Sequence, residues 1–302
     1  MKFFGLTHFD FMKTRRIWYI ASSVVIVLGV LGAFTKGVKL GIDFTGGTEL
    51  VVRFENAPAI SEIRTSMEKI GFDRAEIKTF GNKNDILIRT GEQSRGGEIA
   101  EKIRSGLQSQ FPDKTFSVLK EDKIGPKIGA ELRTNAIYAI IASLVIILIY
   151  VGFRFKFIFG VGGIIALIHD VLATFSVIVL LEGTSSYFNL EISQNVIAAF
   201  LTLVGFSIND TVVIFDRIRE NTNIHRGETL YNIINKSINE TLSRTMITNG
   251  TVFIVLLVLV IFGGEVNRGF ALTFFIGSIF GTYSTVYIAS AIVYDWSPKK
   301  IK

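Results

Sequence analysis

Six long apolar segments constrain the fold of this chain more than any other feature of its sequence. Each comes close to the roughly 20 residues that a helix needs to cross a hydrocarbon layer about 30 Å thick. They are expected near residues 17–34, 137–153, 157–181, 196–215, 245–262 and 270–294. Because runs of this length exceed those in the helices of a soluble core, the sequence predicts an α-helical polytopic membrane protein with six transmembrane helices.

The distribution of Lys and Arg predicts how these helices are oriented. Basic residues gather before the first segment, in the second-to-third and fourth-to-fifth connections, and at the C-terminus, whereas residues 182–191 carry none. Since basic residues are enriched in short loops that stay inside the cell, both termini are expected to be cytoplasmic. The net charge of +6 is thus attributed to topology and not to nucleic-acid binding. The first segment lacks a convincing small-residue cleavage site, which favours a retained anchor over a secretory signal.

A stretch of ordinary soluble composition, residues 37–132, separates the first two segments and is expected on the outer face of the membrane. Alternating and helical patterns within it predict strands and helices in the order βαββαβ, an α+β ferredoxin-like domain. The strands are expected at 49–54, 76–80, 85–89 and 115–120, and the helices at 58–70 and 98–110.

The rest of the chain divides around this exported domain. Residues 1–36 are expected to form the cytoplasmic N-tail and the first helix, 133–294 the five-helix remainder of the membrane domain, and 295–302 a cytoplasmic tail. Within the remainder, residues 216–244 carry an apolar stripe at helical spacing: Leu230, Ile233, Ile234, Ile238 and Leu242. Two interpretations stay open for this amphipathic segment, a helix on the bilayer surface or a helix packed under the bundle.

Strongly polar side chains interrupt three of the apolar segments. They are His169 and Asp170 in the third segment, Asn209 and Asp210 in the fourth, and Arg244 at the start of the fifth. A charge near the bilayer centre costs roughly 2.5–3.5 kcal/mol on insertion scales, so such residues seldom face lipid. Asp210, about 7.5 Å inside the cytoplasmic boundary of its segment, is the leading candidate site residue.

Two polar faces are predicted to meet around Asp210. Helical spacing puts Ser207 and Thr211 on its own face, and it aligns a second set on the fifth segment: Arg244, Thr248 and Thr251. If the faces meet, burial disfavours the ionised carboxylate while the guanidinium favours it, so small movements would bind or release a proton.

Structural interpretations remain beside this relay. Asp210 would also suit a structural salt bridge or an interhelical hydrogen bond, and Arg244 would suit a side chain that snorkels from a helix end. The pair His169–Asp170 would suit packing as well as proton relay.

Other chemistry is weakly supported by the sequence. The run GIDFTGG at residues 41–47 would need a helix directly after its glycines to bind phosphate, but a strand is expected there, so turn or close-packing glycines are preferred. No nucleotide loop, metal motif or catalytic constellation appears, so the chain is expected to be no enzyme and to use neither a cofactor nor a metal.

Five motifs in order along the chain carry a family resemblance. They are GIDFTGG (41–47), IGPKIGAEL (124–132), ALIHDV (166–171), VGFSINDTVVIFDRIREN (204–221) and LSRTMITNG (242–250). Together they resemble SecF, the smaller membrane subunit family of the SecDF protein-export factor, within the resistance-nodulation-division superfamily. Phe206 departs from the commoner form, in which a Tyr stands at this place.

The resemblance implies a function for the buried charges. A proton-motive-force-coupled auxiliary subunit of the Sec translocase would assist late steps of preprotein export with SecD, beside the SecYEG channel and the SecA ATPase, in the bacterial cytoplasmic (inner) membrane. The proton-relay aspartate of the family falls on Asp210 and its functional arginine on Arg244. Two alternatives are a small-molecule efflux transporter of the same superfamily and a scaffold that moves no protons.

Overall fold

The computed structural model describes residues 8–92, 98–155, 157–185, 188 and 190–297. The chain forms two compact units. The first comprises Met1–Gly37, Ala139–Leu180 and Val196–Lys302, and the second comprises Val38–Tyr138 and Leu181–Asn195.

Six helices of the described chain are long and apolar enough to cross a membrane, as the sequence predicts. Five of them are α1 (Arg15–Lys36, after the 3-10 turn η1, Met12–Thr14), α5 (Pro126–Arg154), α6 (Phe157–Leu181), α7 (Gln194–Ile224) and α8 (Leu230–Phe262). The sixth is made of α9 (Gly264–Ser284), the π-helical turn η2 (Thr285–Ala289) and α10 (Ser290–Trp296). Several extend beyond the predicted apolar segments because a helix continues into water where its side chains become polar.

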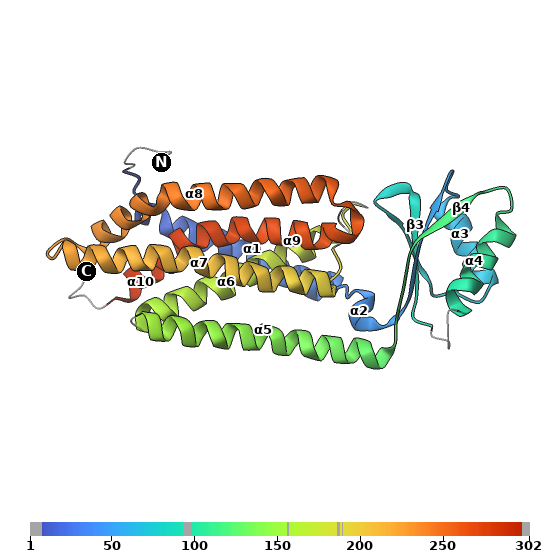
Figure 1. Ribbon diagram of the computed structural model, residues 1–302, viewed down its shortest axis with the longest axis horizontal. Helices are drawn as coiled ribbons and strands as arrows, with labels where there is room; N and C mark the ends of the chain where they lie inside the picture. The colour runs from blue at the N-terminus through green and yellow to red at the C-terminus, as the bar shows by residue number, and fades with distance from the viewer. Residues whose placement is uncertain (1–7, 93–97, 156, 186–187, 189, 298–302) are drawn as a thin grey trace. The chain divides into compact units, whose positions relative to one another are not determined.

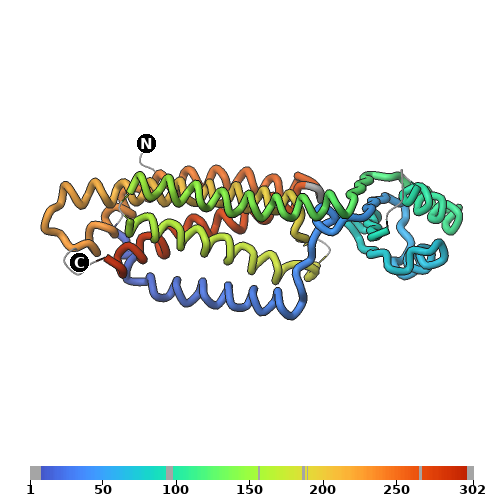
Figure 2. Tube along the Cα trace, turned by 90° about the horizontal axis from the view of Figure 1, so that it is seen from below, coloured from blue at the N-terminus to red at the C-terminus, as the bar shows by residue number. Residues whose placement is uncertain are grey.

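The helices of the first unit run side by side (Figures 1 and 2). Helices α1 and α6 approach most closely at Gly29, where an added Cβ would lie 2.0 Å from Cβ of Ser176. On the sides turned away from the bundle, α1 and α5 expose aliphatic side chains such as Leu31 and Ile146. These exposed faces suit a lipid environment, where apolar side chains need no burial in protein.

The amphipathic segment packs under the bundle. Residues 216–244 do not form a separate surface helix: α7 continues to Ile224, and α8 is continuous from Leu230. Leu230, Ile233, Ile234 and Ile238 are buried in one cluster with residues such as Phe215 and Ile292. The stripe is therefore a core-facing helix side, which corrects the bilayer-surface alternative.

The second unit contains a four-stranded antiparallel sheet with strand order β2-β3-β1-β4. Its elements are β1 (Gly47–Phe54), α3 (Ile60–Lys69), β2 (Glu76–Phe80), β3 (Asn82–Thr90), α4 (Glu98–Gln110) and β4 (Phe116–Ile124). Both helices lie on one face of the sheet (Figure 1). Since successive strand residues face opposite ways, Leu50, Val52 and Phe54 meet the helices and bury the core of this unit with Ile63 and Ile103.

The GIDFTGG run contains a short helix that sequence reasoning missed, α2 (Ile42–Thr45). The preferred reading of its glycines as turn and close-packing residues is confirmed at Gly47. This residue has φ 127°, and a Cβ there would lie 2.4 Å from the carbonyl oxygen of Thr90. Only glycine fits a position that combines positive φ with such a close approach.

Candidate functional site

The carboxylate of Asp210 lies on α7, buried between helices of the first unit. Its side chain is 5% exposed, and Oδ2 accepts a hydrogen bond from Nδ2 of Asn249 on α8 at 2.7 Å. None of the described Lys, Arg or His side chains forms an ion pair with it. Asp210 thus has one hydrogen-bond donor and no ion-pair partner among the described residues, which is a sparse set of contacts for a buried carboxylate.

Asn249 links Asp210 to a third helix. The same Nδ2 also donates to Oγ1 of Thr282 on α9 at 2.8 Å, and the Thr282 hydroxyl donates to the carbonyl oxygen of Ser278 at 2.7 Å. Asn249 is 1% exposed, and its Oδ1 has no hydrogen-bond partner in the described part of the chain. An unpaired acceptor of this kind is uncommon in a protein interior.

A second carboxylate, Asp170 on α6, lies in a different environment. Its Oδ2 accepts from the hydroxyls of Ser207 at 2.5 Å and Ser284 at 2.8 Å, and its Oδ1 lies 2.9 Å from Nδ1 of His169. At 1% exposure it is the more deeply buried of the two. Asp170 therefore links α6, α7 and α9 through the polar contacts of one carboxylate.

The His169 ring extends this network to α1. Its Nε2 lies 3.1 Å from the hydroxyl of Tyr283, which lies 2.7 Å from Oγ of Ser22. In the tautomer whose Nδ1–H donates a hydrogen bond to Asp170, Nε2 accepts a hydrogen bond from the Tyr283 hydroxyl. That hydroxyl in turn accepts a hydrogen bond from Ser22. The result is a buried chain of polar contacts from α1 through α9 to α6.

The structure brings together only one of the two predicted polar faces. Ser207, Asp210 and Thr211 are all buried, and the Thr211 hydroxyl lies 3.1 Å from that of Thr285. Asn209, which points about 100° away from Asp210 around α7, is exposed.

On α8, the polar side chains that are buried are different from the predicted ones. Arg244 and Thr251 are exposed and Thr248 is half-buried, whereas the buried polar residues are Thr241, Thr245 and Asn249. No carboxylate oxygen of the described residues lies within 4.0 Å of the Arg244 guanidinium. Arg244 precedes Asn249 by five residues, so it lies about 7.5 Å along the axis toward the start of α8. Arg244 and Asp210 therefore form no direct ion pair in the structure.

Sequence reasoning missed the contribution of the sixth helix. Ser284 and Thr285 come at the entry to η2, and Thr282 and Tyr283 precede them, so four consecutive residues supply partners to Asn249, His169, Asp170 and Thr211. The run GTYSTVY in an otherwise apolar segment was the available signal. π-Helical turns within α-helices often occur at functional sites, because the extra residue re-aims the side chains beside it.

A charge network covers the helix-free face of the sheet in the second unit. Arg89 on β3 pairs with Glu49, Glu76 and Glu191, and Lys78 pairs with Glu191 from β2. Burial of Glu191 acts to raise its pKa, but the bonds from Arg89 and Lys78 prevail and hold the pKa below its ordinary value. Glu191 therefore anchors the loop before α7 to the sheet.

The same loop contacts the segment before α2. Backbone bonds join Ile192 to Lys39 and to Gly41, each at 2.9 Å. Oδ2 of Asp43 accepts the backbone N–H of Gln194 at 2.7 Å. Because Gln194 is the first residue of α7, Asp43 satisfies one of the N–H groups that a helix start leaves unpaired.

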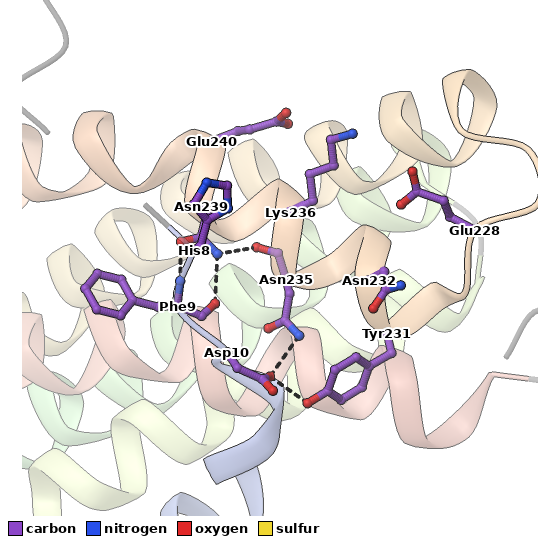
Figure 3. A pocket seen from close by; sticks show the side chains of 10 residues that line it. All are labelled: His8, Phe9, Asp10, Glu228, Tyr231, Asn232, Asn235, Lys236, Asn239 and Glu240. Atoms are coloured by element: carbon purple, nitrogen blue, oxygen red, sulfur yellow. Dashed lines mark hydrogen bonds between the residues drawn. The ribbon is translucent and has the colours of Figure 1, made fainter. Parts of the chain in front are cut away.

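A groove of about 610 Å³ lies where the N-terminal tail meets the beginning of α8 (Figure 3). Asn239 pairs with both backbone groups of Phe9, accepting from its N–H at 3.0 Å and donating to its carbonyl at 2.9 Å. Asn235 accepts from the N–H of Met12, and Asp10 accepts from Asn235 and from Tyr231. The bond from Tyr231 holds the pKa of Asp10 below its ordinary value.

No three His, Cys, Asp or Glu side chains within the described ranges gather as a metal site.

Comparisons with known proteins identify the family of this chain. The sequence profile of the protein export membrane protein SecD/SecF C-terminal family matches residues 105–299, and that of the SecD/SecF GG motif matches residues 32–58. The protein translocase subunit SecF of Rhodothermus marinus is 40% identical over 295 residues, which cover 98% of this chain and 95% of that protein. The chain belongs to the SecF family.

Solved SecDF structures agree with this membership. The crystal structure of SecDF, described as a translocon-associated membrane protein, from Thermus thermophilus matches with a TM-score of 0.84 and 38% identity. A SecDF structure in a super-membrane-facing form matches with a TM-score of 0.67 and 37% identity. Each match covers 96% of this chain and 39% of the SecDF chain, so this SecF-family chain spans about two fifths of those proteins.

Proposed function

We propose that this chain is a proton-motive-force-coupled auxiliary subunit of the Sec translocase, which assists late steps of preprotein export together with SecD. The observation that carries the proposal is the Asp210 carboxylate, buried in a membrane helix with one hydrogen bond and no ion pair among the described residues. A carboxyl group with so few partners gains and loses a proton at low cost, whereas the Asp170 carboxylate is engaged by Ser207, Ser284 and His169.

In this proposal Asp210 carries the proton, and Arg244 approaches it during the cycle from its exposed position one to two turns nearer the start of α8. Ser207, Thr211, His169 and Asp170 position the helices around the carrier, while Asn209, Thr248 and Thr251 lie outside this polar cluster and keep only a supporting role. A charge that crosses the membrane gains about 2.3 kcal/mol per 100 mV, so several protons are needed for one large substrate.

The setting of the proposal is the cytoplasmic membrane of a bacterium, with both termini inside. Residues 37–132, whose sheet has the strand order of a ferredoxin-like fold, act as the exported domain and meet the emerging preprotein. SecD supplies the rest of the membrane assembly, beside SecYEG and SecA. The names of the relatives as translocase subunits favour this setting over small-molecule efflux.

The test is export into membrane vesicles with and without a proton gradient. Asp210→Asn removes the proton carrier, so we expect the gradient-dependent part of export to disappear while the ATP-driven part remains. Asp216→Asn is the matched control, because Asp216 lies on the same helix in exposed ion pairs with Arg154 and Arg219, and such pairs contribute little. Full stimulation of the Asp210→Asn complex by the gradient would show that Asp210 carries no proton and would leave the scaffold alternative.

A further inference from the structure

We infer that the side-chain amide of Asn249 turns over when Asp210 takes up a proton, so that Asn249 is a positioning residue that pairs with both protonation states. This inference rests on the proposed function, in which Asp210 exchanges a proton, and it names the residue that responds to the exchange. The evidence is the contact set of a single amide buried between three helices.

The observed contacts fit an ionised Asp210. An ionised carboxylate can only accept hydrogen bonds, and Nδ2 of Asn249 supplies one at 2.7 Å. The second N–H of the same amide goes to Thr282 at 2.8 Å. Both donors of Asn249 are therefore used, and its acceptor Oδ1 is left without a partner among the described residues.

Protonation of Asp210 gives the carboxyl group an O–H that must donate a hydrogen bond. A proton on Oδ2 would point at the N–H groups of Asn249 and leave the acid without an acceptor. Oδ1 receives no hydrogen bond from a described residue, so the contact that responds to the proton is the one between Oδ2 and Asn249. A buried O–H without an acceptor is costly, so the protonated acid calls for an acceptor at the place where Nδ2 lies.

Asn249 holds that acceptor unused. The N and O ends of an amide have nearly the same shape, so rotation about the last side-chain bond exchanges them without repacking the neighbours. After rotation Oδ1 faces Asp210 and accepts its O–H. The Thr282 hydroxyl, which now donates to Ser278, can turn to donate to the same oxygen, since a hydroxyl both donates and accepts.

The two orientations are balanced by their contacts. In each one the amide makes two hydrogen bonds and leaves one end unpaired, while the Thr282 hydroxyl exchanges its bond to Ser278 for one to Oδ1. The proton on Asp210 then decides the orientation. Proton binding on α7 thereby replaces a hydrogen-bond donor of Asn249 on α8 by an acceptor and turns the Thr282 hydroxyl on α9. No charge moves on either of these two helices.

Infrared difference spectra of the full chain in lipid vesicles, recorded between acidic and alkaline buffer with asparagine labelled in its side-chain amide, test the inference. We expect an acid carbonyl band that Asp210→Asn removes. We also expect an amide band that both Asn249→Ser and Asp210→Asn remove. Asn267→Ser is the matched control and should change neither band, because Asn267 is exposed and bonds only to the carbonyl of Gly263 among the described residues.

The outcomes separate the two proposals. If no acid band depends on Asp210, the proposed function fails and the amide inference fails with it. If Asp210→Asn removes the acid carbonyl band but Asn249→Ser removes no amide band, the inference alone is overturned.

Export assays supply a second readout. Asn249→Leu can neither donate nor accept, so gradient-dependent export should fall about tenfold, the equivalent of one lost hydrogen bond to a charged group. Asn249→Ser, whose hydroxyl does both, should retain more of that export than the Leu variant. Equal losses in the two variants at equal amounts of folded protein would count against the inference.

Discussion

Asp43 and Gln194 are joined across 151 residues by one hydrogen bond, in which the Asp43 carboxylate accepts the first backbone N–H of α7 at 2.7 Å. The GIDFTGG segment thus holds the start of the helix that carries Asp210. A cap of this kind is supplied through the fold and not by the residue that precedes the helix.

Replacing Asp43 should loosen the first turn of α7. Asp43→Ala removes the acceptor, so we expect a loss of about 1 kcal/mol, the usual contribution of a helix cap. Amide hydrogen exchange at residues 194–197 measures the change. Asp43→Asn keeps an acceptor oxygen and should exchange nearly as slowly as the original chain; similar protection in the Ala variant would mean that the contact adds no stability.

The Glu191 anchor should make the second unit sensitive to acid. Because the folded pKa of Glu191 is depressed, its contribution is fully present above the ordinary value of 4.5 and is lost as pH falls through the lower folded value. Urea unfolding of the sheet at several pH values measures this loss. Glu191→Gln should flatten the pH dependence below 4.5, whereas Glu92→Gln, at an exposed position, should not.

The close approach of α1 to α6 should tolerate no side chain at position 29. In Gly29→Ala the new Cβ would overlap Ser176, so the helices must separate at a cost of about 1–3 kcal/mol. Thermal unfolding in detergent provides the comparison. Gly250→Ala adds the same methyl group where no atom lies within 4 Å, and it should leave the transition unchanged. Equal behaviour of the two variants would refute the close packing.

The N-terminal tail should detach when its asparagine contacts are removed. Asn239→Ala deletes both bonds to the backbone of Phe9, so amide exchange at Phe9 should accelerate about tenfold. Asn232 lines the same groove, but among the described contacts its side chain makes no bond to the tail (Figure 3). Asn232→Ala is therefore the control, and unchanged exchange in the Asn239 variant would show that the tail is held by other contacts.

The membrane helices could be predicted from the sequence because a helix in lipid must be apolar over a fixed length. The burial of Asp210 followed from the same reasoning, since a carboxylate in such a helix avoids lipid. The strands and helices around Leu50 and Ile103 were predicted because alternation and helical spacing are local properties.

The partners of Asp210 could not be predicted in the same way. Periodicity indicates which residues share a side of a helix, but it does not say which side turns inward. The prediction therefore named Arg244, whereas the contact is made by Asn249, little more than one turn further along. Glu191 looked like an ordinary loop residue because its partners, Lys78 and Arg89, lie more than a hundred positions away. Such contacts depend on tertiary packing, which no local pattern contains.

Helix α8 has 33 residues in one uninterrupted run, which makes it about 50 Å long. A hydrocarbon layer of about 30 Å cannot enclose it, so part of the helix extends beyond that layer. The first turns, where Asn235 and Asn239 hold the tail, are polar and suit that part. Because a helix of this length is stiff, a slight tilt at Asn249 displaces its first residues by a longer path, and a reporter group attached at Lys236 would register motions that begin at Asn249 between the buried helix faces.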